Sequence, residues 1–136
     1  MSITYTASNK ILDKTFGASA FTPPTSYYVA LSTTAPVADG TNITEPVASG
    51  YTRVQVTNTD KTNWTNSASG SLTNATSVTF PESTATWGVI ISVVLFDAST
   101  GGNAYFFDTL VPSRSVAANT TVFFAIGAIT ISMTNS

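Results

Sequence analysis

Few side chains in this sequence could carry acid–base chemistry. The chain has seven carboxylates and five basic residues, but no histidine and no cysteine. It therefore lacks an imidazole that exchanges protons near neutral pH and a thiolate nucleophile. Asp97 and Asp108 flank a predicted turn and form the one pair that could approach as in a glycosidase. A simpler interpretation is that Asp97 caps the turn and Asp108 ends a strand. We predict that the protein is not an enzyme and has no catalytic residue.

The sequence offers equally little to a metal ion or a cofactor. Asp39-Gly40-Thr41-Asn42 has a superficial likeness to a calcium loop. It lacks the alternating oxygen ligands and the closing bidentate glutamate of such a loop. Without cysteine and histidine, soft-metal ligands are missing as well. We expect no metal site and no cofactor.

Aromatic side chains are the remaining candidates for a binding site. A sugar-stacking platform, as in a carbohydrate-binding module, could draw on Tyr27, Tyr28, Tyr51, Trp64, Trp87 and Tyr105. Core packing and subunit contacts use aromatic residues just as readily. Trp87 precedes a strongly apolar segment, so we predict that it lies in the core. Trp64 stands in a polar stretch and is the best candidate for an exposed contact with a sugar, a lattice or a sister subunit.

The low charge narrows the classes of partner. Charged residues make up 9% of the chain, against roughly 25% in an average soluble domain. The five basic residues are scattered, which argues against nucleic-acid binding. The apolar runs at 89–96 and 122–131 are too short to span a bilayer and no secretory signal is visible, so we expect no membrane association. Few charged side chains guard the sheet edges, which favours a homo-oligomer.

The elements that must position these residues are mostly strands. Strand patterns occur at 27–32, 51–57, 77–80, 89–96, 103–107 and 120–132, separated by turn signals. Near the N-terminus, Ser8 is the predicted cap of one short helix that carries Ile11, Leu12 and Phe16 on one face and ends at Gly17. The pattern predicts one all-β domain over residues 1–136. We expect an antiparallel, jelly-roll-like β-sandwich with residues 1–25 as an N-terminal arm or helix.

Two of the predicted strands are apolar on both faces. The segments 89–96 and 120–132 carry large apolar residues at successive positions, so both faces of each strand must be covered. We expect them to form the core and a subunit interface. The long segment 34–50 contains several turn formers, and loops of this size are often functional or contact a partner.

The order of several short motifs resembles a family of small tailed-phage virion proteins. The likeness covers nearly the whole chain and rests on Ile11-Leu12 with Phe16-Gly17, Tyr28–Pro36, Glu45-Pro46, Gly50–Val54, Trp64, Asn74, Val78–Pro81, Trp87-Gly88, Phe96–Ala98 and Gly101–Asn103. One departure is Ala118-Asn119-Thr120, where the family usually has a Gly-Asp turn. Asparagine also adopts that turn conformation.

This resemblance implies a β-sandwich structural protein made in the cytoplasm of a bacterial host and carried on the virion. We expect a capsid decoration (cement) protein, a trimer that binds the major capsid protein on the outside of the head. The alternatives are a minor tail, baseplate or tail-fibre component bound to tail proteins, and, more distantly, a carbohydrate-binding module. The residues expected to contact the capsid or a sister subunit are Tyr5, Ile11, Phe16, Pro36, Val37 and Trp64.

Overall fold

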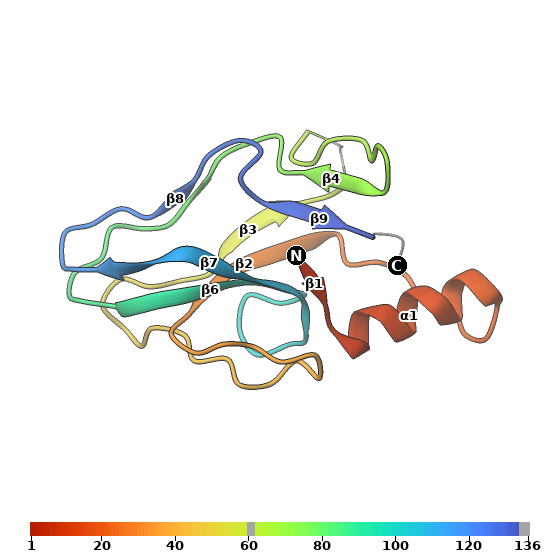
Figure 1. Cartoon of the computed structure of the whole chain (residues 1–136), viewed down its shortest axis with the longest axis horizontal. Coiled ribbons are helices and arrows are strands. Elements are labelled where there is room, and N and C mark those ends of the chain that lie inside the picture. Colours follow the sequence, from red (N-terminus) through yellow and green to blue (C-terminus); the bar gives the residue numbers. More distant parts are fainter. Residues whose placement is uncertain (60–61, 134–136) are drawn as a thin grey trace.

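A computed structural model describes residues 1–59 and 62–133 and arranges them as two β layers with one helix at the side (Figure 1). The larger layer is an antiparallel sheet in the order β1-β7-β6-β2-β3. Its strands are β1 (Ser2–Ile3), β2 (Ser26–Ser32), β3 (Val54–Thr57), β6 (Gly88–Phe96) and β7 (Ala104–Val116). The smaller layer pairs β4 (Ser71–Thr73) with β9 (Thr130–Ser132), and β5 (Val78–Thr79) with β8 (Phe123–Phe124). The predicted all-β, antiparallel, sandwich-like fold with a short N-terminal helix is confirmed.

The main core contains apolar side chains from both layers. It includes Val29, Leu31, Val93, Leu95, Val78, Phe80, Trp87 and Ile129, all nearly inaccessible to solvent. Trp87 is 4% exposed and its indole N–H donates a 2.9 Å hydrogen bond to the carbonyl of Ser49. The prediction that Trp87 lies in the core is therefore confirmed.

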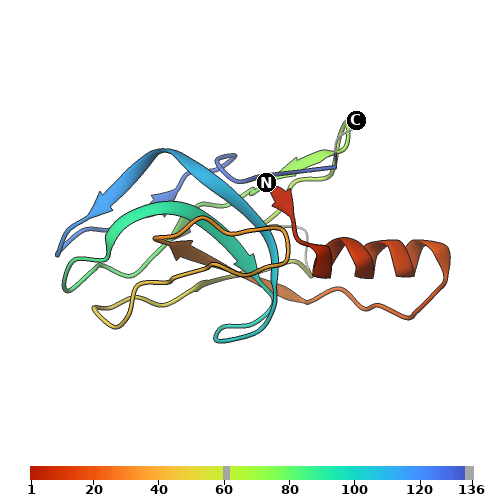
Figure 2. The same cartoon turned by 60° about the horizontal axis from the view of Figure 1, so that its bottom comes forward.

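The outer face of the large sheet is covered by the segment between β2 and β3. A second buried cluster of Ala30, Val94, Phe96 and Ala104 packs against Ile43 from this segment. Figure 2 shows the segment running across the sheet, and a 2.9 Å bond from the amide of Thr33 to the carbonyl of Thr44 closes it. Most of β6 is thus covered within one chain, although Val89 near its start is 50% exposed. Over Val94 and Phe96 a loop of the same molecule takes the place expected of a sister subunit, and a subunit interface through the remaining apolar surface stays a prediction.

The helix begins earlier than its sequence pattern suggests. Helix α1 (Tyr5–Phe16) is capped by Thr4, whose hydroxyl accepts from the amide of Ala7 and donates to the carbonyl of Ala104. Ser8, the predicted cap, lies inside the helix. Thr4 is the better cap because its side chain is buried and joins the helix to β7. The helix ends at Gly17 in the left-handed conformation, as predicted. No helix of the described residues is long and apolar enough to cross a membrane.

Strand β7 extends well past the predicted segment 103–107, although it contains Pro112. Proline cannot donate to a β ladder and is tolerated at bulges. Pro112 falls where the register with β6 slips: Ser92 pairs with Thr109 but Ile90 pairs with Arg114. The irregularity leaves room for the proline, and the pairing resumes beyond it.

The predicted strand at 120–132 is broken into β8 and β9. Gly127 takes a positive φ of 80° between them. The fully buried side chain of Asn74 holds the break by donating to the carbonyls of Thr76 and Ala125 and accepting from the amide of Ile129. A buried amide with its hydrogen bonds made in this way fixes the backbone on both sides. Further along the chain, Asn119 has a φ of 59°, so it adopts the turn conformation expected of it.

Candidate functional site

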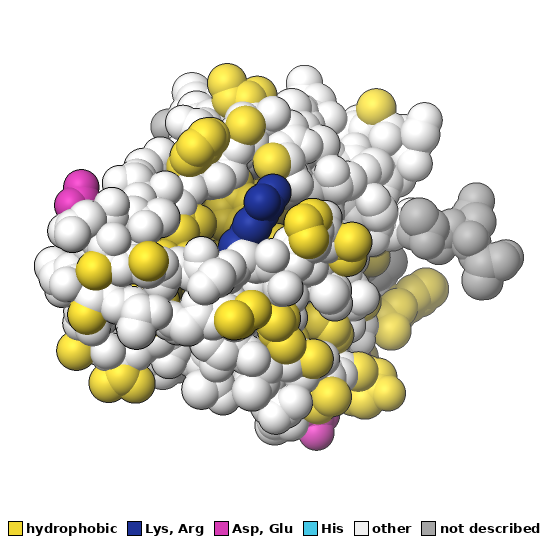
Figure 3. Space-filling model, turned by 60° about the vertical axis from the view of Figure 1, so that its left-hand side comes forward, with side chains coloured by type: hydrophobic (Ala, Val, Ile, Leu, Met, Phe, Trp, Pro, Cys, Tyr) yellow, Lys and Arg dark blue, Asp and Glu magenta, His cyan; other side chains and the backbone are white. Residues whose placement is uncertain are grey.

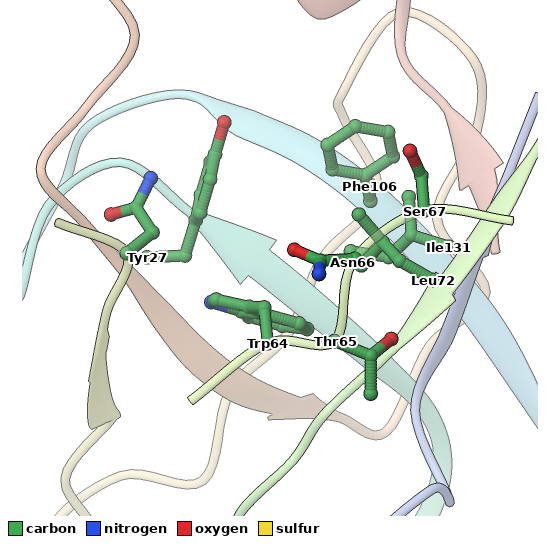
Figure 4. A pocket seen from close by; sticks show the side chains of 9 residues that line it. Tyr27, Trp64, Thr65, Asn66, Ser67, Leu72, Phe106 and Ile131 are labelled. Carbon is green, nitrogen blue, oxygen red and sulfur yellow. The ribbon is translucent and has the colours of Figure 1, made fainter. Parts of the chain in front are cut away.

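A cavity of about 350 Å³ lies between the large sheet and the β4–β9 pair. Its apolar walls are Tyr27 from β2, Phe106 from β7, Leu72 from β4, Ile131 from β9 and the ring of Trp64; its polar lining comes from Asn58, Thr65, Asn66 and Ser67. In Figure 4 the rings of Trp64 and Tyr27 border the same space, and the amide of Asn66 points toward it. The cavity therefore combines aromatic surfaces with uncharged polar groups.

The aromatic side chains that line the cavity are positioned by contacts with other residues of the fold. The ring of Tyr27 packs edge-on against Tyr105 and Phe106, with centroid distances of 5.6 and 6.3 Å. Trp64 forms an isolated β bridge with Asn74, the residue that also fixes the break between β8 and β9. Both rings are thus positioned by buried neighbours, which lowers the entropy lost when a ligand is bound.

Two buried polar atoms of the lining residues have no partner among the residues that the structure describes. They are the indole nitrogen Nε1 of Trp64 and the amide oxygen Oδ1 of Asn58. The Asn58 amide is oriented by its nitrogen, which donates a 2.7 Å bond to the carbonyl of Pro24. One orphan is a donor and the other an acceptor, and leaving either unpaired in a buried place costs free energy.

The described residues that line the cavity are uncharged. Burial is the main cause that raises the pKa of Tyr27 to about 12, with smaller electrostatic contributions from the neighbouring Tyr105 and Asp97. Its phenol therefore stays protonated at any ordinary pH. The ammonium of Lys10 lies just outside, where it donates a 2.9 Å bond to the phenol oxygen of Tyr105 and faces that ring.

The residues predicted to make contacts are spread over the molecule. Tyr5 and Phe16 are 63% and 81% exposed on α1, and Ile11 is half-buried on the same helix. Val37 is 45% exposed, whereas Pro36 is buried within the loop over the sheet. Pro36 is therefore not available as a contact residue, because the loop that carries it folds onto its own chain.

Trp64 is not the freely exposed side chain that its polar surroundings suggested. It is half-buried and packs against the main core while lining the cavity. Asn58 and Asn66 were not singled out in the sequence. Only their position within a polar stretch around a lone tryptophan could have drawn attention to them.

The carboxylate pair considered for catalysis does not come together. Asp97 accepts from the backbone and side-chain nitrogens of Asn103 and so closes the β6–β7 turn. Asp108 lies opposite Val93, four residues further along the ladder, which corresponds to about 13 Å. Asp39 accepts from the amide and hydroxyl of Thr41, the arrangement of a simple turn.

A second surface of interest lies at the end of the molecule opposite α1. A groove of about 220 Å³ runs between the outer part of β7 and β8, lined by Leu110, Val111, Pro112, Arg114, Val122 and Phe123 among others. Val111 and Phe123 are 90% and 63% exposed. Figure 3 shows apolar side chains gathered on this side of the molecule around a hollow, with a basic side chain lying across it.

Comparison with known proteins assigns the chain to a family. Residues 2–132 match the family described as "Podophage GP4 fiber I protein gp80". A comparison with curated protein sequences found no match. The family match covers nearly the whole chain, including both β layers and α1. The chain therefore belongs to the gp80 fiber I family and is a structural protein of a tailed-phage virion.

Proposed function

We propose that the protein is a non-catalytic subunit of a tail fibre. The observation that carries this proposal is the match of residues 2–132 to a family described as a podophage fiber protein. That description favours a fibre over the capsid decoration role expected from the sequence, and tail proteins over the major capsid protein as partners.

The two ends of the subunit support an assembly role. On α1, Tyr5, Leu12 and Phe16 are all more than half exposed. Their spacings of seven and eleven residues correspond to about two and three helical turns, so they form one apolar face. Exposed apolar surfaces of this kind usually mark sites of protein–protein contact. At the other end, the groove between β7 and β8 is apolar and concave.

We infer that the helix of one copy docks into this groove of the next copy. The groove contains Arg114, which has no ion pair among the described residues, and Asp13 on α1 offers the opposite charge beside the apolar face. A contact between two different surfaces repeats from subunit to subunit and closes into a ring when the rotation permits. A three-membered ring is the trimer that we expect, built around a fibre axis.

The position in the virion is tested by counting and locating the protein. Quantitative mass spectrometry of purified particles should give a copy number close to that of the tail proteins, and immunogold labelling should mark the tail. A copy number in step with the major capsid protein, with label on the head, would instead establish capsid decoration.

The assembly interface is tested by light scattering on the purified protein. The expected mass is three times the 14.2 kDa of one chain. Phe16→Ser and Phe123→Ser should each shift the mass toward the monomer. Val47→Ser is the matched control, because Val47 is 87% exposed and belongs to neither surface. A wild-type monomer at high concentration, or an equal effect of the control, would contradict the proposed contact.

A further inference from the structure

We propose that the cavity bordered by Tyr27 and Trp64 is a binding site for a neutral saccharide of one or two rings. The inference goes beyond the assembly role, since it concerns the isolated chain and does not depend on where the chain sits in the virion. It rests on the size, wall chemistry and unpaired polar atoms of the cavity.

The size of the cavity limits the ligand. Small-molecule sites in proteins commonly enclose roughly 300–1,000 Å³. At about 350 Å³ this cavity lies at the lower end of that range. The volume suits one or two pyranose rings, and a longer glycan would have to extend beyond the cavity.

The walls match the two kinds of surface that a sugar ring presents. A pyranose has C–H groups on its faces and hydroxyl groups around its edge. Aromatic rings offer a flat apolar face with a negative quadrupole, which suits polarised C–H groups. The rings of Trp64 and Tyr27 border the cavity, while Thr65, Asn66 and Ser67 supply amide and hydroxyl groups from one exposed segment (Figure 4).

The two orphan atoms point to hydroxyl groups in particular. A hydroxyl both donates and accepts hydrogen bonds. It can therefore accept from Nε1 of Trp64 or donate to Oδ1 of Asn58, the two atoms that lack a partner among the described residues. Both atoms are covered by neighbouring atoms, so a sugar that bonds to them must first displace part of the lining, and we infer that the exposed segment 65–67 is the part that moves. That segment is attached to β4 by the bonds between Thr65 and Thr73.

The charge of the lining selects neutral sugars. No described lining residue is acidic or basic. A uronic or sialic acid would place an uncompensated carboxylate against apolar walls, which is unfavourable without a cationic partner. The ammonium of Lys10 is directed to Tyr105 rather than into the cavity.

The test is a titration of the full chain with methyl glycosides of glucose, galactose, mannose and N-acetylglucosamine and with maltose and lactose, followed by NMR. Two tryptophan indole N–H signals are expected, and Trp64→Phe identifies the one from Trp64. A binding sugar should shift that signal and leave the signal of the buried Trp87 in place. Glucuronic acid and sialic acid serve as charged comparisons, and cyclohexanol as an apolar one.

Variants separate the two parts of the site. Trp64→Phe keeps an aromatic ring but removes the N–H, and should weaken binding about tenfold, as for one lost hydrogen bond. Asn66→Ala should weaken binding by a similar factor of about ten. Val47→Ala is the control, because Val47 is 87% exposed and lines neither the cavity nor the groove between β7 and β8. Circular dichroism checks that each variant is folded.

The outcomes are decisive in both directions. A shift of the Trp64 signal by a neutral sugar, together with an affinity in isothermal titration calorimetry that Trp64→Phe and Asn66→Ala weaken and Val47→Ala does not, supports the site. The inference is overturned if no neutral sugar binds at millimolar concentration, if only charged sugars or cyclohexanol bind, or if the cavity variants bind like the wild type. Copy number and location in the virion are measured separately, so the fibre proposal can fail or hold independently.

Discussion

Replacing Arg53 by alanine should destabilise the fold strongly, because this side chain joins three segments. Its Nε and one terminal nitrogen donate to the two carboxylate oxygens of Glu45 at 3.0 and 2.7 Å. The other terminal nitrogen donates to the carbonyls of Ala98 and Gly101 in the β6–β7 turn. The guanidinium carbon lies 3.6 Å from the ring centroid of Phe96. Arg53→Ala therefore frees the loop over the sheet from the turn beneath it.

The expected loss follows from the burial of this ion pair. The side chains of Arg53 and Glu45 are 7% and 24% exposed. Removing one partner of a buried pair costs about 3–5 kcal/mol, because the other charge stays behind uncompensated. Unfolding entropy near the midpoint is about 2.1 cal/mol/K per residue, or about 0.29 kcal/mol/K for 136 residues. The melting temperature should fall by about 10–17 °C.

Thermal and urea denaturation followed by circular dichroism measure this effect. Lys14→Ala is the matched control, since Lys14 is exposed and has no ion pair among the described residues; it should change stability by less than about 0.5 kcal/mol. A double-mutant cycle with Glu45→Gln separates the ion pair from the bonds to the turn. If Arg53→Ala melted within about 3 °C of the wild type, a shift of about 1 kcal/mol, the loop would be held by something other than this pair.

Three further predictions concern the same architecture. Burial is the largest influence on Glu45 and opposes its ionisation, but the hydrogen bonds from Arg53 and Tyr51 and the charge of Arg53 outweigh it, so its pKa lies below the ordinary 4.5. The contribution of ionised Glu45 to stability is therefore complete above pH 4.5 and is lost as the pH falls through the lower pKa of the folded state. The urea concentration at the unfolding midpoint should fall over this acidic range in the wild type and fall less in Glu45→Gln. A wild-type midpoint that does not change with pH would contradict this. Asn74→Ala should cost about 3 kcal/mol by leaving the carbonyl of Thr76 and the amide of Ile129 unpaired, and a melting temperature equal to that of the wild type would show that those groups find other partners. Gly50→Ala should destabilise by about 1–3 kcal/mol, because Gly50 has a φ of 80° and an added Cβ would lie 2.8 Å from a backbone oxygen; a neutral effect in urea unfolding would mean that the turn can relax.

Local patterns in the sequence were enough to predict much of the sheet. The apolar runs at 27–32 and 89–96 became β2 and β6 almost unchanged, because each carries β-branched and aromatic residues between turn formers. The ends of the other elements are set by tertiary contacts between residues that are far apart in the sequence. Thr4 caps α1 because β7 offers it a buried acceptor, and the run at 120–132 breaks because Asn74, far away in the sequence, binds both sides of the break.

The candidate site shows the same division between local and tertiary information. Trp64 could be singled out because a tryptophan in a polar stretch is unusual. Its partners around the cavity come from separate strands and loops, and no spacing in the sequence brings Tyr27, Asn58 and Phe106 beside it. The apolar faces of β6 were predicted to need cover, but periodicity does not say whether that cover comes from the same chain or another one.

The loop folded over the outer sheet bears on the order of events in making a particle. A newly synthesised subunit conceals Ala30, Val94 and Phe96 beneath its own residues and so has little reason to wait for a sister before folding. We expect maturation in two stages, with compact single copies first and association through their ends afterwards. Refolding rates that stay constant as protein concentration is varied would be the signature of that sequence.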